Sequence, residues 1–333
     1  MPHDPTERRP NGQTGSGAAP EPFQPTDADP TTLAWPTDAP AHPAPVLGED
    51  CWFLSGPTAS GKSSLAVRMA RLLGAEIVSV DSMAVYRGLD VGTAKPSADD
   101  RRHVPHHLVD VVDPGEAYSV ARWLAAAADA VADCRRRGRA ILFVGGTPLY
   151  LRALRDGLAP LPAADLDLRR ALVAEAAERG SAALHRRLAE VDPAAAARIH
   201  PHDVKRIVRG LEVARATGRP LSDAFAARPH PLFEPRLMIL DLPRATLHDR
   251  IDRRVERMFA AGLVEETRAA LAGPGGIGPT ASQAAGYAEA IDVIAGRIDV
   301  AEAIRRTQRR TRQLAKRQLT WLRSFKDAVW ICA

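Results

Sequence analysis

The sequence predicts an α/β fold, with a parallel sheet that carries helices on both faces and an additional all-helical insertion. From residue 51 onward, short apolar runs of strand length alternate with segments of helical periodicity. Between the third and fourth of these runs, about seventy residues contain only helical patterns, which is too long for one crossover connection. The composition, 45% hydrophobic and 26% charged over 333 residues, is that of a globular protein and excludes a wholly disordered chain.

The first 48 residues are expected to form a disordered arm. They hold 11 of the 27 prolines and two basic against six acidic residues, so they bury too little apolar surface to offset the entropy lost on ordering. An arm that docks on a specific partner is the alternative interpretation. The α/β core is expected over residues 49–164 and 232–333, and the insertion over residues 165–231.

Five apolar runs are expected to be buried strands, with helices between them. The strands are placed at residues 51–55, 76–81, 141–144, 237–241 and 328–332. One intervening helix presents apolar residues at helical spacing, namely Val120, Trp123, Ala127, Val131 and Cys134. The insertion is expected to hold helices at residues 166–179, 182–191, 194–199 and 204–217, with Gly180 and Gly218 as C-terminal stops.

The chain carries no signal for a membrane or for secretion. No apolar run reaches the roughly 18 residues of a membrane span, and the N-terminus lacks the basic and apolar regions of a signal peptide. The three cysteines fit no disulfide or zinc pattern, and the adjacent His106 and His107 would point apart and hydrogen-bond or pack separately. We therefore expect a cytoplasmic protein with no membrane partner.

The first predicted strand runs into a P-loop motif, GxxxxGK[ST], followed by a helix that is expected to end before Gly74. In such a loop the glycines let backbone N–H groups face an anion, the lysine neutralises phosphate, and the serine hydroxyl can hold Mg²⁺. The chain has only five lysines, so a lysine within a motif is informative. The motif predicts a phosphate site formed by Gly56, Pro57, Thr58, Ala59, Ser60, Gly61, Lys62 and Ser63.

A carboxylate, Asp81, ends the second predicted strand, whereas the third ends in Gly145-Gly146-Thr147 without an acid. In a doubly wound sheet, a carboxylate at the C-terminal end of a strand beside the P-loop lies where ligands bind. Asp81 could be a general base, a metal ligand or a structural helix cap, and the pattern leaves these roles open. The two glycines are expected to permit a close backbone approach.

The C-terminal segment is expected to be one long basic helix over residues 302–324. Four cations fall on one stripe, Arg305, Arg309, Arg312 and Lys316, and further arginines form a second stripe beside it. Residues 301–333 hold nine basic against two acidic residues, and such an excess repels itself unless a polyanion neutralises it. We expect this helix to bind a nucleic-acid backbone without sequence preference, and a solvated charged face is the alternative.

Six sequence blocks between residues 51 and 325 can be compared together with known families. They read GPTASGKSSLA, DSMAVYRGLDVGTAKP, PHHLVDVVDP, FVGGTPLYLRAL, DVKRIVRGLEV and RTRQLAKRQLTW. In this order they resemble bacterial tRNA dimethylallyltransferases, also called tRNA isopentenyltransferases. The resemblance implies a monomeric enzyme with Mg²⁺ as cofactor. It would transfer a dimethylallyl group from dimethylallyl diphosphate to N6 of adenosine 37 in the anticodon stem-loop of tRNA.

The resemblance also implies roles for individual residues. Asp81 would be the base at the N6 amine, and Thr58 and Arg254 would act on the diphosphate; these are the expected catalytic residues. Ser63 would hold Mg²⁺, and Arg250, one turn from Arg254, would face the same diphosphate as the P-loop. The expected tRNA contacts, besides the basic stripe, are Asp81, Ser82, Met83, Ala84, Thr147, Arg169, Lys205, Arg206, Ile207, Val208 and Arg209.

Three other functions compete with this interpretation. A P-loop kinase of small molecules predicts ATP turnover and gives the basic helix no role. An adenylate isopentenyltransferase, which prenylates free AMP or ATP, needs neither the long insertion nor the basic helix. A non-catalytic tRNA-binding protein would not need Asp81 beside an intact P-loop.

Overall fold

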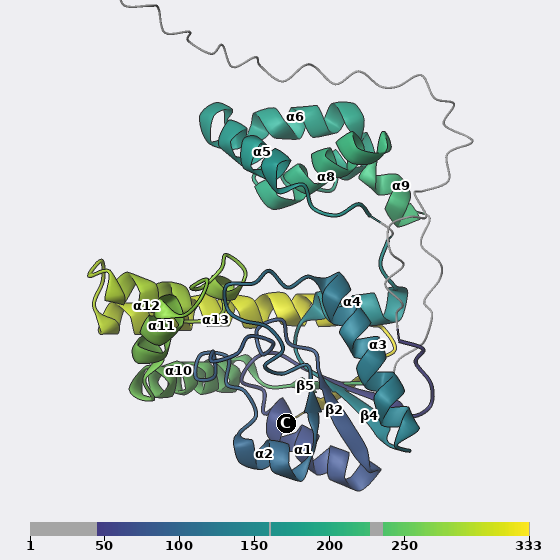
Figure 1. The fold of residues 1–333 in the computed structure, drawn as a ribbon, viewed down its shortest axis with the longest axis vertical. Helices are drawn as coiled ribbons and strands as arrows, with labels where there is room; N and C mark the ends of the chain where they lie inside the picture. The colour runs from purple at the N-terminus through teal and green to yellow at the C-terminus, as the bar shows by residue number, and fades with distance from the viewer. Residues whose placement is uncertain (1–44, 160, 227–235, 333) are drawn as a thin grey trace, which may run out of the picture. The chain divides into compact units, whose positions relative to one another are not determined.

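The structure, a computed structural model, describes residues 45–159, 161–226 and 236–332. The chain divides into two compact units: Leu161–Ala224 forms a helical unit, and the segments on either side of it form an α/β unit (Figure 1). The disordered arm expected over residues 1–48 lies outside the described residues, except for residues 45–48. Residues 227–235, where the insertion is expected to end, lie outside them as well.

A six-stranded parallel sheet forms the centre of the α/β unit, in the order β3-β2-β4-β1-β5-β6. Five strands confirm the apolar runs to within two residues. The sixth, β3, was not expected, because two histidines carry no apolar pattern. The strands are β1 (Cys51–Ser55), β2 (Ala75–Ser79), β3 (His106–His107), β4 (Ala140–Val144), β5 (Leu237–Asp241) and β6 (Val329–Cys332).

The strand order brings three loops to one edge of the sheet. β1 pairs with β4 on one side and with β5 on the other, and β2 pairs with the far side of β4. The carboxyl ends of parallel strands point the same way, so the segments that follow β1, β2 and β4 emerge together. These segments are the P-loop, the segment that begins at Asp81, and the Gly145-Gly146-Thr147 turn.

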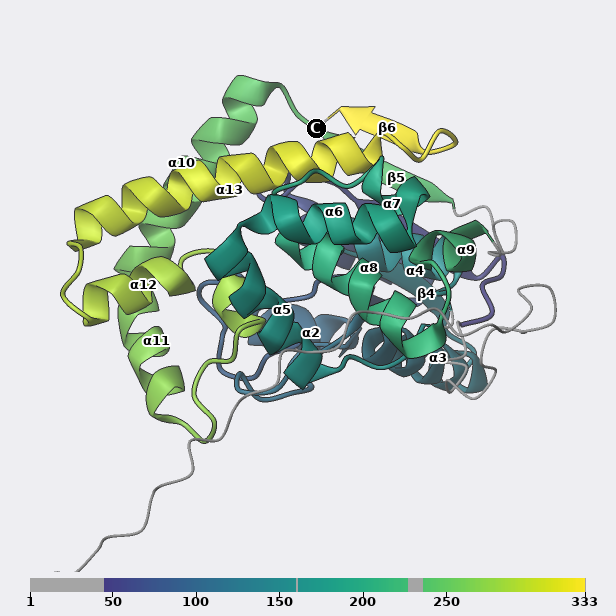
Figure 2. The same cartoon turned by 90° about the horizontal axis from the view of Figure 1, so that it is seen from above.

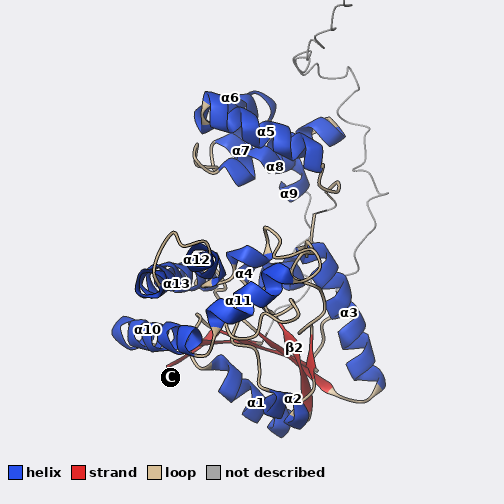
Figure 3. Cartoon of the chain, turned by 60° about the vertical axis from the view of Figure 1, so that its left-hand side comes forward, coloured by secondary structure: helices blue, strands red, loops and turns tan. Residues whose placement is uncertain are grey.

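Helices cover both faces of this sheet, because successive side chains of each strand point to opposite sides (Figure 3). The face opposite to α1 (Lys62–Leu73) is covered by α3 (Val120–Arg136) and α4 (Pro148–Asp156), where Trp123 is fully buried and stacks on Tyr150. On its own face α1 contributes small residues to a core that contains Leu54, Ile77, Leu142, Ala66 and Ala70.

The helix boundaries follow the sequence signals. α1 ends at Gly74, whose φ of 61° is the left-handed conformation typical of a helix C-cap, as expected. The residues expected on the inner face of α3 are buried, except Val120, which is half-buried. α2 (Ala98–His103) begins at a capping box: the Ser97 side chain accepts a hydrogen bond from the Asp100 backbone, and the Asp100 side chain accepts one from the Ser97 backbone. Within the described part of the chain, no helix is both long and apolar enough to cross a bilayer.

Four helices form a further layer of the α/β unit: α10 (Arg244–Ala260), α11 (Leu263–Ala272), α12 (Tyr287–Ile294) and α13 (Val300–Leu322). A 3-10 turn, η1 (Ala281–Gln283), precedes α12. The long α13 packs along α10 and α12 (Figure 2). It confirms the expected basic helix to within two residues. Its buried face consists of Ala303, Thr307, Thr311, Ala315, Gln318 and Leu322.

The helical unit has its own apolar core. It contains α5 (Leu166–Arg179), α6 (Ser181–Val191), α7 (Pro193–Ala196) and α8 (Val204–Thr217), followed by α9 (Leu221–Ala226). Gly210 lets α8 approach α6 closely, since a Cβ there would lie 2.6 Å from Leu188 Cδ1. The core residues are Leu172, Leu184, Leu188, Ala196, Ile207, Val208 and Leu211.

A buried ionic cluster joins β2 to β3 and α3. The Glu76 carboxylate accepts hydrogen bonds from both terminal nitrogens, Nη1 and Nη2, of Arg137, and His107 Nε2 lies 2.7 Å from Glu76 Oε2. Cys134 Sγ lies 3.6 Å from the same oxygen. Glutamate, histidine and thiol could together hold a metal, but Arg137 already neutralises the carboxylate, and we read the cluster as an ion-paired network. Arg137 above all, helped by His107, lowers the pKa of Glu76 to about 2.

We expect Glu76→Gln to lower the free energy of unfolding of the α/β unit by roughly 1–3 kcal/mol at pH 7, because it removes the buried carboxylate that accepts charged hydrogen bonds from the partly exposed Arg137. Since the pKa of Glu76 is lowered by folding, its contribution is complete above about pH 5 and is lost as the pH falls through about 2. Urea unfolding at pH 7, 4 and 2.5 should show the difference between wild type and variant shrinking toward acid pH.

The matched control is Glu116→Gln. Glu116 forms an exposed ion pair with Arg122 at 3.6 Å, and such pairs contribute at most about 1 kcal/mol. An equal loss of stability in both variants would contradict the assignment of Glu76 as a buried structural anion.

Candidate active site

The P-loop connects β1 to α1, which confirms the strand–loop–helix context that the motif requires. Gly56 and Gly61 have φ values of 148° and 93°, conformations that other residues rarely adopt. A Cβ on Gly56 would lie 2.8 Å from Leu240 O, so the loop packs tightly on β5. Lys62 Nζ donates hydrogen bonds to Gly56 O at 2.9 Å and Pro57 O at 2.7 Å. The lysine therefore folds over the loop that precedes it.

The P-loop and α10 line an open cavity of about 730 Å³. Arg250 Nη1 lies 3.4 Å from Ser60 O, and Arg254 Nη2 lies 3.4 Å from Thr93 O, so both arginines bridge from α10 toward the loops opposite. The structure thus brings together the P-loop and the two arginines expected from the sequence. The charged residues that line the cavity are Lys62, Arg250, Arg253, Arg254, Arg257 and Glu256. Such an excess of positive charge suits an anionic ligand.

Two of the cavity cations, Lys62 and Arg254, are half-buried and interact with the carboxylate of Asp81. The pKa of Lys62 is lowered to about 8, mainly by burial and then by the charge of Arg254, while Asp81 acts in the opposite direction. Burial also lowers the pKa of Arg254, and Asp81 again opposes the shift. A bound anion would stabilise the charged forms of both side chains. The same interactions place Asp81 in the field of the phosphate-binding cations.

Asp81 has two carboxylate oxygens with different surroundings. Oδ1 accepts backbone hydrogen bonds from Met83 at 2.8 Å and from Ala84 at 3.4 Å. Asp81 therefore caps a turn, and the expected alternative of a helix cap is wrong, because no helix begins here. Oδ2 has no hydrogen-bond partner among the described residues. One oxygen therefore fixes the turn and leaves the other available to a ligand, and the roles of base or metal ligand stay predictions.

The end of β4 packs directly against the segment that carries Asp81. A Cβ on Gly145 would lie 2.1 Å from Val80 O, and one on Gly146 would also clash, which confirms the close approach expected of these glycines. Thr147 Oγ1 accepts a hydrogen bond from Ser82 N at 3.1 Å. Thr147 and Ser82, both expected to contact tRNA, therefore lie side by side next to the predicted base.

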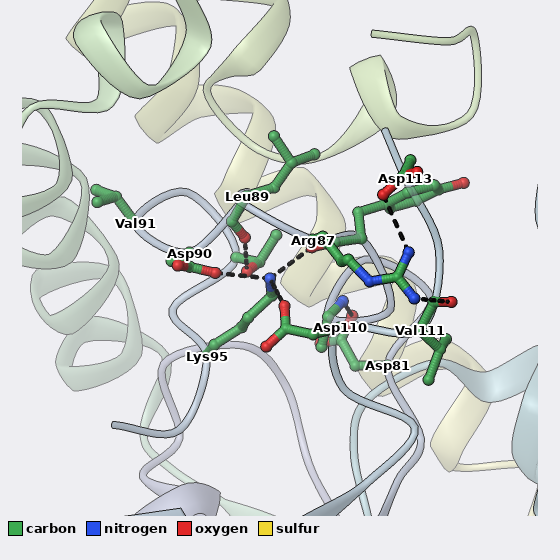
Figure 4. A network of polar contacts seen from close by, with 12 residues as sticks. Asp81, Arg87, Leu89, Asp90, Val91, Lys95, Asp110, Val111 and Asp113 are labelled. Atoms are coloured by element: carbon green, nitrogen blue, oxygen red, sulfur yellow. Dashed lines mark hydrogen bonds and ion pairs between the residues drawn. The ribbon is translucent and has the colours of Figure 1, made fainter. Parts of the chain in front are cut away.

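A buried lysine fixes the loop that follows Asp81 (Figure 4). Lys95, 2% exposed, donates hydrogen bonds to a backbone carbonyl, to Asp90 at 2.6 Å and to Asp110. Arg101 binds the other oxygen of Asp110 at 2.6 Å, and Asp110 N donates to Ala84 O at 3.1 Å. Because the Ala84 side chain is itself buried, this position can offer a substrate only its backbone.

A second anchor of the same loop comes from α11. One oxygen of Glu266 accepts the backbone N–H groups of Asp90 at 2.8 Å and Val91 at 2.9 Å, and the other accepts the Tyr287 hydroxyl at 2.6 Å. The loop continues to Thr93 and Ala94 at the cavity. Lys95 and Glu266 together hold the middle of the segment between Asp81 and the cavity wall, at Tyr86 and over residues 90–92.

The residues present fit a magnesium ion that would be held mainly through the oxygens of a phosphate ligand. Ser63 lies in the first turn of α1, is exposed and lines the cavity. Asp81 supplies the nearby carboxylate, and no acid follows β4. Mg²⁺ prefers oxygen ligands and usually keeps several waters, so one hydroxyl and phosphate oxygens suffice to bind it.

The basic stripe of α13 divides into paired and unpaired cations. Arg305 binds Glu302 at 2.9 Å, and Arg312 binds both oxygens of Asp252 on α10 at 2.6 and 2.7 Å. The expectation that the stripe lacks acidic partners is therefore wrong for these two arginines, because acids of neighbouring helices and of α13 itself neutralise them. The other members of the stripe are exposed and form no ion pair with any described residue: Arg309 and Lys316.

The C-terminal half of α13 borders an open hollow of about 410 Å³, lined by Gln313, Lys316, Arg317, Thr320 and Trp321. The guanidinium of Arg152, from α4, lies 5.3 Å from the centre of the Trp321 ring. Lys316 therefore lies beside a cationic and aromatic surface, a combination that suits nucleic acid.

In the helical unit, two predicted tRNA contacts bind a buried acid. Glu212 is 1% exposed, and its carboxylate accepts hydrogen bonds from Arg169 at 3.0 and 2.9 Å and from Arg209 at 2.5 Å. Burial raises the pKa of Glu212, but the two arginines outweigh it and lower the pKa overall. Arg169 and Arg209 therefore stabilise this unit whatever else they bind.

The predicted segment from Lys205 to Arg209 presents two faces of α8. Ile207 and Val208 are buried in the apolar core of the helical unit, at 0% and 4% exposure. Their side chains therefore do not belong to a tRNA-facing surface, which corrects the sequence prediction. Lys205 and Arg206 are exposed on the other face.

Three residues around the site were missed by the sequence prediction: Lys95, Glu266 and Gln318. Lys95 carried a usable signal, since it is one of five lysines and lies in a block of the resemblance. Gln318 also carried one, because it interrupts the buried face of an otherwise regular helix. Glu266 carried none, since its partners lie 174 to 176 positions earlier in the chain.

Comparison with known families covers nearly the whole α/β unit and the insertion. The family model for IPP transferase matches residues 84–325, and the model for isopentenyl transferase matches residues 49–106. Among curated relatives, the tRNA dimethylallyltransferase of Anaeromyxobacter dehalogenans is 54% identical over 283 residues, 84% of this chain and 93% of the relative. That of Geobacter metallireducens is 47% identical over 284 residues, 84% of this chain and 91% of the relative.

Solved structures agree with these matches. The full-length tRNA isopentenylpyrophosphate transferase of Bacillus halodurans is 38% identical, with a TM-score of 0.61, covering 86% of this chain and 90% of that one. A eukaryotic dimethylallyltransferase described as acting on tRNA is 27% identical, with a TM-score of 0.70, covering 85% of this chain and 73% of that one. From sequence and structure together, the chain belongs to the IPP transferase family of tRNA dimethylallyltransferases.

Proposed function

We propose that this chain transfers a dimethylallyl group from dimethylallyl diphosphate to the N6 amine of adenosine 37 in tRNA and releases diphosphate. The observation that carries the proposal is the cationic P-loop cavity, whose Lys62 and Arg254 interact electrostatically with the carboxylate of Asp81. Family membership supplies the reaction class. The rival functions share parts of this arrangement, but none of them needs all of it.

The cavity is suited to stabilising a leaving group. As the allylic C1–O bond breaks, negative charge accumulates on the departing diphosphate. Lys62, Arg250 and Arg254 surround the place where that charge would develop, and their positions are set before the ligand arrives. Such preorganised charge lowers the barrier, because no reorganisation is needed in the transition state. Mg²⁺, bound by Ser63 and the diphosphate, would supply further charge neutralisation.

Asp81 is suited to accept a proton from the N6 amine. An exocyclic adenine amine is a poor nucleophile, and it loses a proton when its nitrogen forms the new bond to C1 of the allyl group. Oδ1 is held by the Met83 and Ala84 amides, while Oδ2 remains free of partners within the described chain. The hydrogen bonds to Oδ1 thus orient the carboxylate and leave Oδ2 available to accept the proton. Thr147 and Ser82, bonded to each other beside it, would line the path of the flipped adenosine.

The polyanionic part of the substrate would lie on the exposed cations of α13 and of the helical unit. Arg309 and Lys316 are charged, exposed and unpaired among the described residues, so they can neutralise phosphates at no cost to an existing ion pair. Lys205 and Arg206 are the exposed members of the predicted segment of α8. A monomer would suffice, since all the proposed groups come from one chain.

The direct test is incubation with labelled dimethylallyl diphosphate and unmodified tRNA, followed by nuclease digestion. Label in N6-isopentenyladenosine at position 37 supports the proposal. Label in free AMP but not in tRNA would favour an adenylate isopentenyltransferase. ATP hydrolysis coupled to turnover would favour a kinase, and binding of tRNA without label a non-catalytic protein.

The variant Asp81→Asn tests the base. An asparagine oxygen can still accept the Met83 and Ala84 amides, so the turn should be kept, but the side chain cannot take a proton. We expect the single-turnover rate to fall roughly 10²–10⁴-fold, with little change in tRNA affinity. More than half of wild-type turnover would remove Asp81 from the mechanism.

The variant Lys62→Ala tests the phosphate cradle. We expect it to abolish turnover and to weaken dimethylallyl diphosphate binding, with no requirement for ATP in the wild type. Since burial lowers the pKa of Lys62 to about 8, wild-type affinity should fall as the pH rises above about 8 and the lysine loses its charge. Calorimetry between pH 7 and 9.5 should show this fall in the wild type and not in the variant, and parallel curves would contradict the assignment.

The double variant Arg309→Gln/Lys316→Gln tests the basic helix. We expect a higher KM for tRNA and an unchanged KM for dimethylallyl diphosphate. The slope of log K for tRNA binding against log salt concentration should become shallower by roughly 1.5, because each phosphate contact that is made releases about 0.7–0.9 counterions and two contacts are lost.

The control removes two exposed cations elsewhere, Arg68 and Arg71 on α1, again by substitution with Gln. Its salt slope should equal that of the wild type. Equal slopes for all three proteins would mean that the α13 stripe is only a solvated face and that tRNA is bound elsewhere.

A further inference from the structure

Gln318 is the polar residue in the buried face of α13 that reaches the candidate active site. Its side chain is 9% exposed and makes two short hydrogen bonds. Oε1 accepts the backbone N–H of Thr58 in the P-loop at 2.9 Å, and Nε2 donates to Gly146 O at 2.7 Å. One amide thus joins two of the three loops that meet at the carboxyl edge of the sheet.

We propose that Gln318 is a positioning residue for the transferase reaction: it sets the shape of the diphosphate cradle and its distance from the segment that carries Asp81. The proposal rests on the function proposed above. In a P-loop the backbone N–H groups normally turn toward phosphate. The Thr58 N–H instead donates to Gln318, so it is not directed at phosphate, and the carbonyls of Gly56 and Pro57 accept hydrogen bonds from Lys62. The loop is therefore held from both sides before a ligand binds.

The second bond extends this control toward the base. Gly146 precedes Thr147, whose hydroxyl accepts the Ser82 N–H next to Asp81. A chain of bonds thus runs from Thr58 through Gln318 and Gly146 to the segment of the predicted base. A change at Gln318 shifts the leaving-group side of the site relative to the acceptor side, and misplacement by about 1 Å can cost 10²-fold in rate.

The residue opposite Gln318 is matched to it. A Cβ on Gly146 would lie 2.6 Å from Gln318 Nε2 and 3.0 Å from Gly56 O. Glycine at this position is therefore required for the amide to bridge the two loops. Both partners of the bond can be changed independently, which makes the proposal open to a double-variant test.

The experiment uses the full chain and the variants Gln318→Met, Gly146→Ala and their combination. Methionine keeps the length and helix propensity of glutamine but removes both hydrogen bonds. We expect Gln318→Met to raise the Kd for inorganic diphosphate with Mg²⁺ and the KM for dimethylallyl diphosphate by about tenfold, and to lower kcat by about 10–100-fold. The Kd for tRNA should stay within about twofold.

Gly146→Ala should change the same constants in the same direction. The combined variant should lose little more activity and diphosphate affinity than the less active of the two single variants, because both substitutions remove the same hydrogen bond. If one single variant does not fold, the other still tests the bond. The control is Gln308→Met on the same helix, whose amide contacts Asp252 and Glu256 instead of the P-loop. It should behave as the wild type.

Amide hydrogen exchange of the ligand-free protein gives a readout that does not depend on the reaction. Loss of the Gln318 bond should speed exchange in peptides that contain Thr58, while peptides of α1 and α3 stay protected. If the wild type fails to transfer a dimethylallyl group, the proposed function is wrong and exchange still tests the bond. Unchanged Thr58 exchange and diphosphate affinity in a folded Gln318→Met would overturn the inference.

Discussion

The candidate site depends on the side-by-side placement of the carboxyl ends of β1, β2 and β4. Neighbouring parallel strands lie about 4.8 Å apart, so the segments that follow them are forced together. The P-loop follows β1, Asp81 follows β2, and Gly145 follows β4 against the Val80 carbonyl. Phosphate-binding and carboxylate groups that are remote in sequence become neighbours because of strand order alone. Without β4 between β1 and β2, neither the Thr147 contact nor the Gln318 bridge could form.

The charges of the α/β unit fall into two kinds, and the difference separates structure from function. Buried ions away from the cavity are paired: Glu76 with Arg137, and Lys95 with Asp110 and Asp90. At the cavity, Lys62 and its neighbouring arginines contact only backbone carbonyls among the described residues. An unpaired, partly desolvated cation is costly. The presence of several such cations at one cavity is explained by an anionic ligand that would supply the missing negative charge.

Features that depend on neighbouring residues in the chain were predictable from the sequence. The P-loop glycines, the end of α1 at Gly74 and the acid that follows β2 are local patterns, and the structure places them together as expected. Pairings between distant segments were beyond it. Arg312 bonds Asp252, sixty positions away in the sequence, and Gln318 bonds Thr58, 260 positions away. No spacing rule applies over such sequence separations. The burial of Ile207 and Val208 is predictable from the sequence, because helical periodicity places both on the face of the core.

α13 connects the two substrates of the proposed reaction within one rigid element. Its buried face reaches the P-loop through Gln318, while its exposed face carries Arg309 and Lys316. A helix rises about 1.5 Å per residue, so Arg309 and Gln318 are separated by about 13 Å along the axis, and this distance cannot vary without breaking the helix. Packing along α10 and α12 then fixes where that axis lies in the unit. A polyanion bound to the outer face, as proposed, would thereby be held at a set distance from the P-loop. Two binding sites on separate loops could not maintain such a distance.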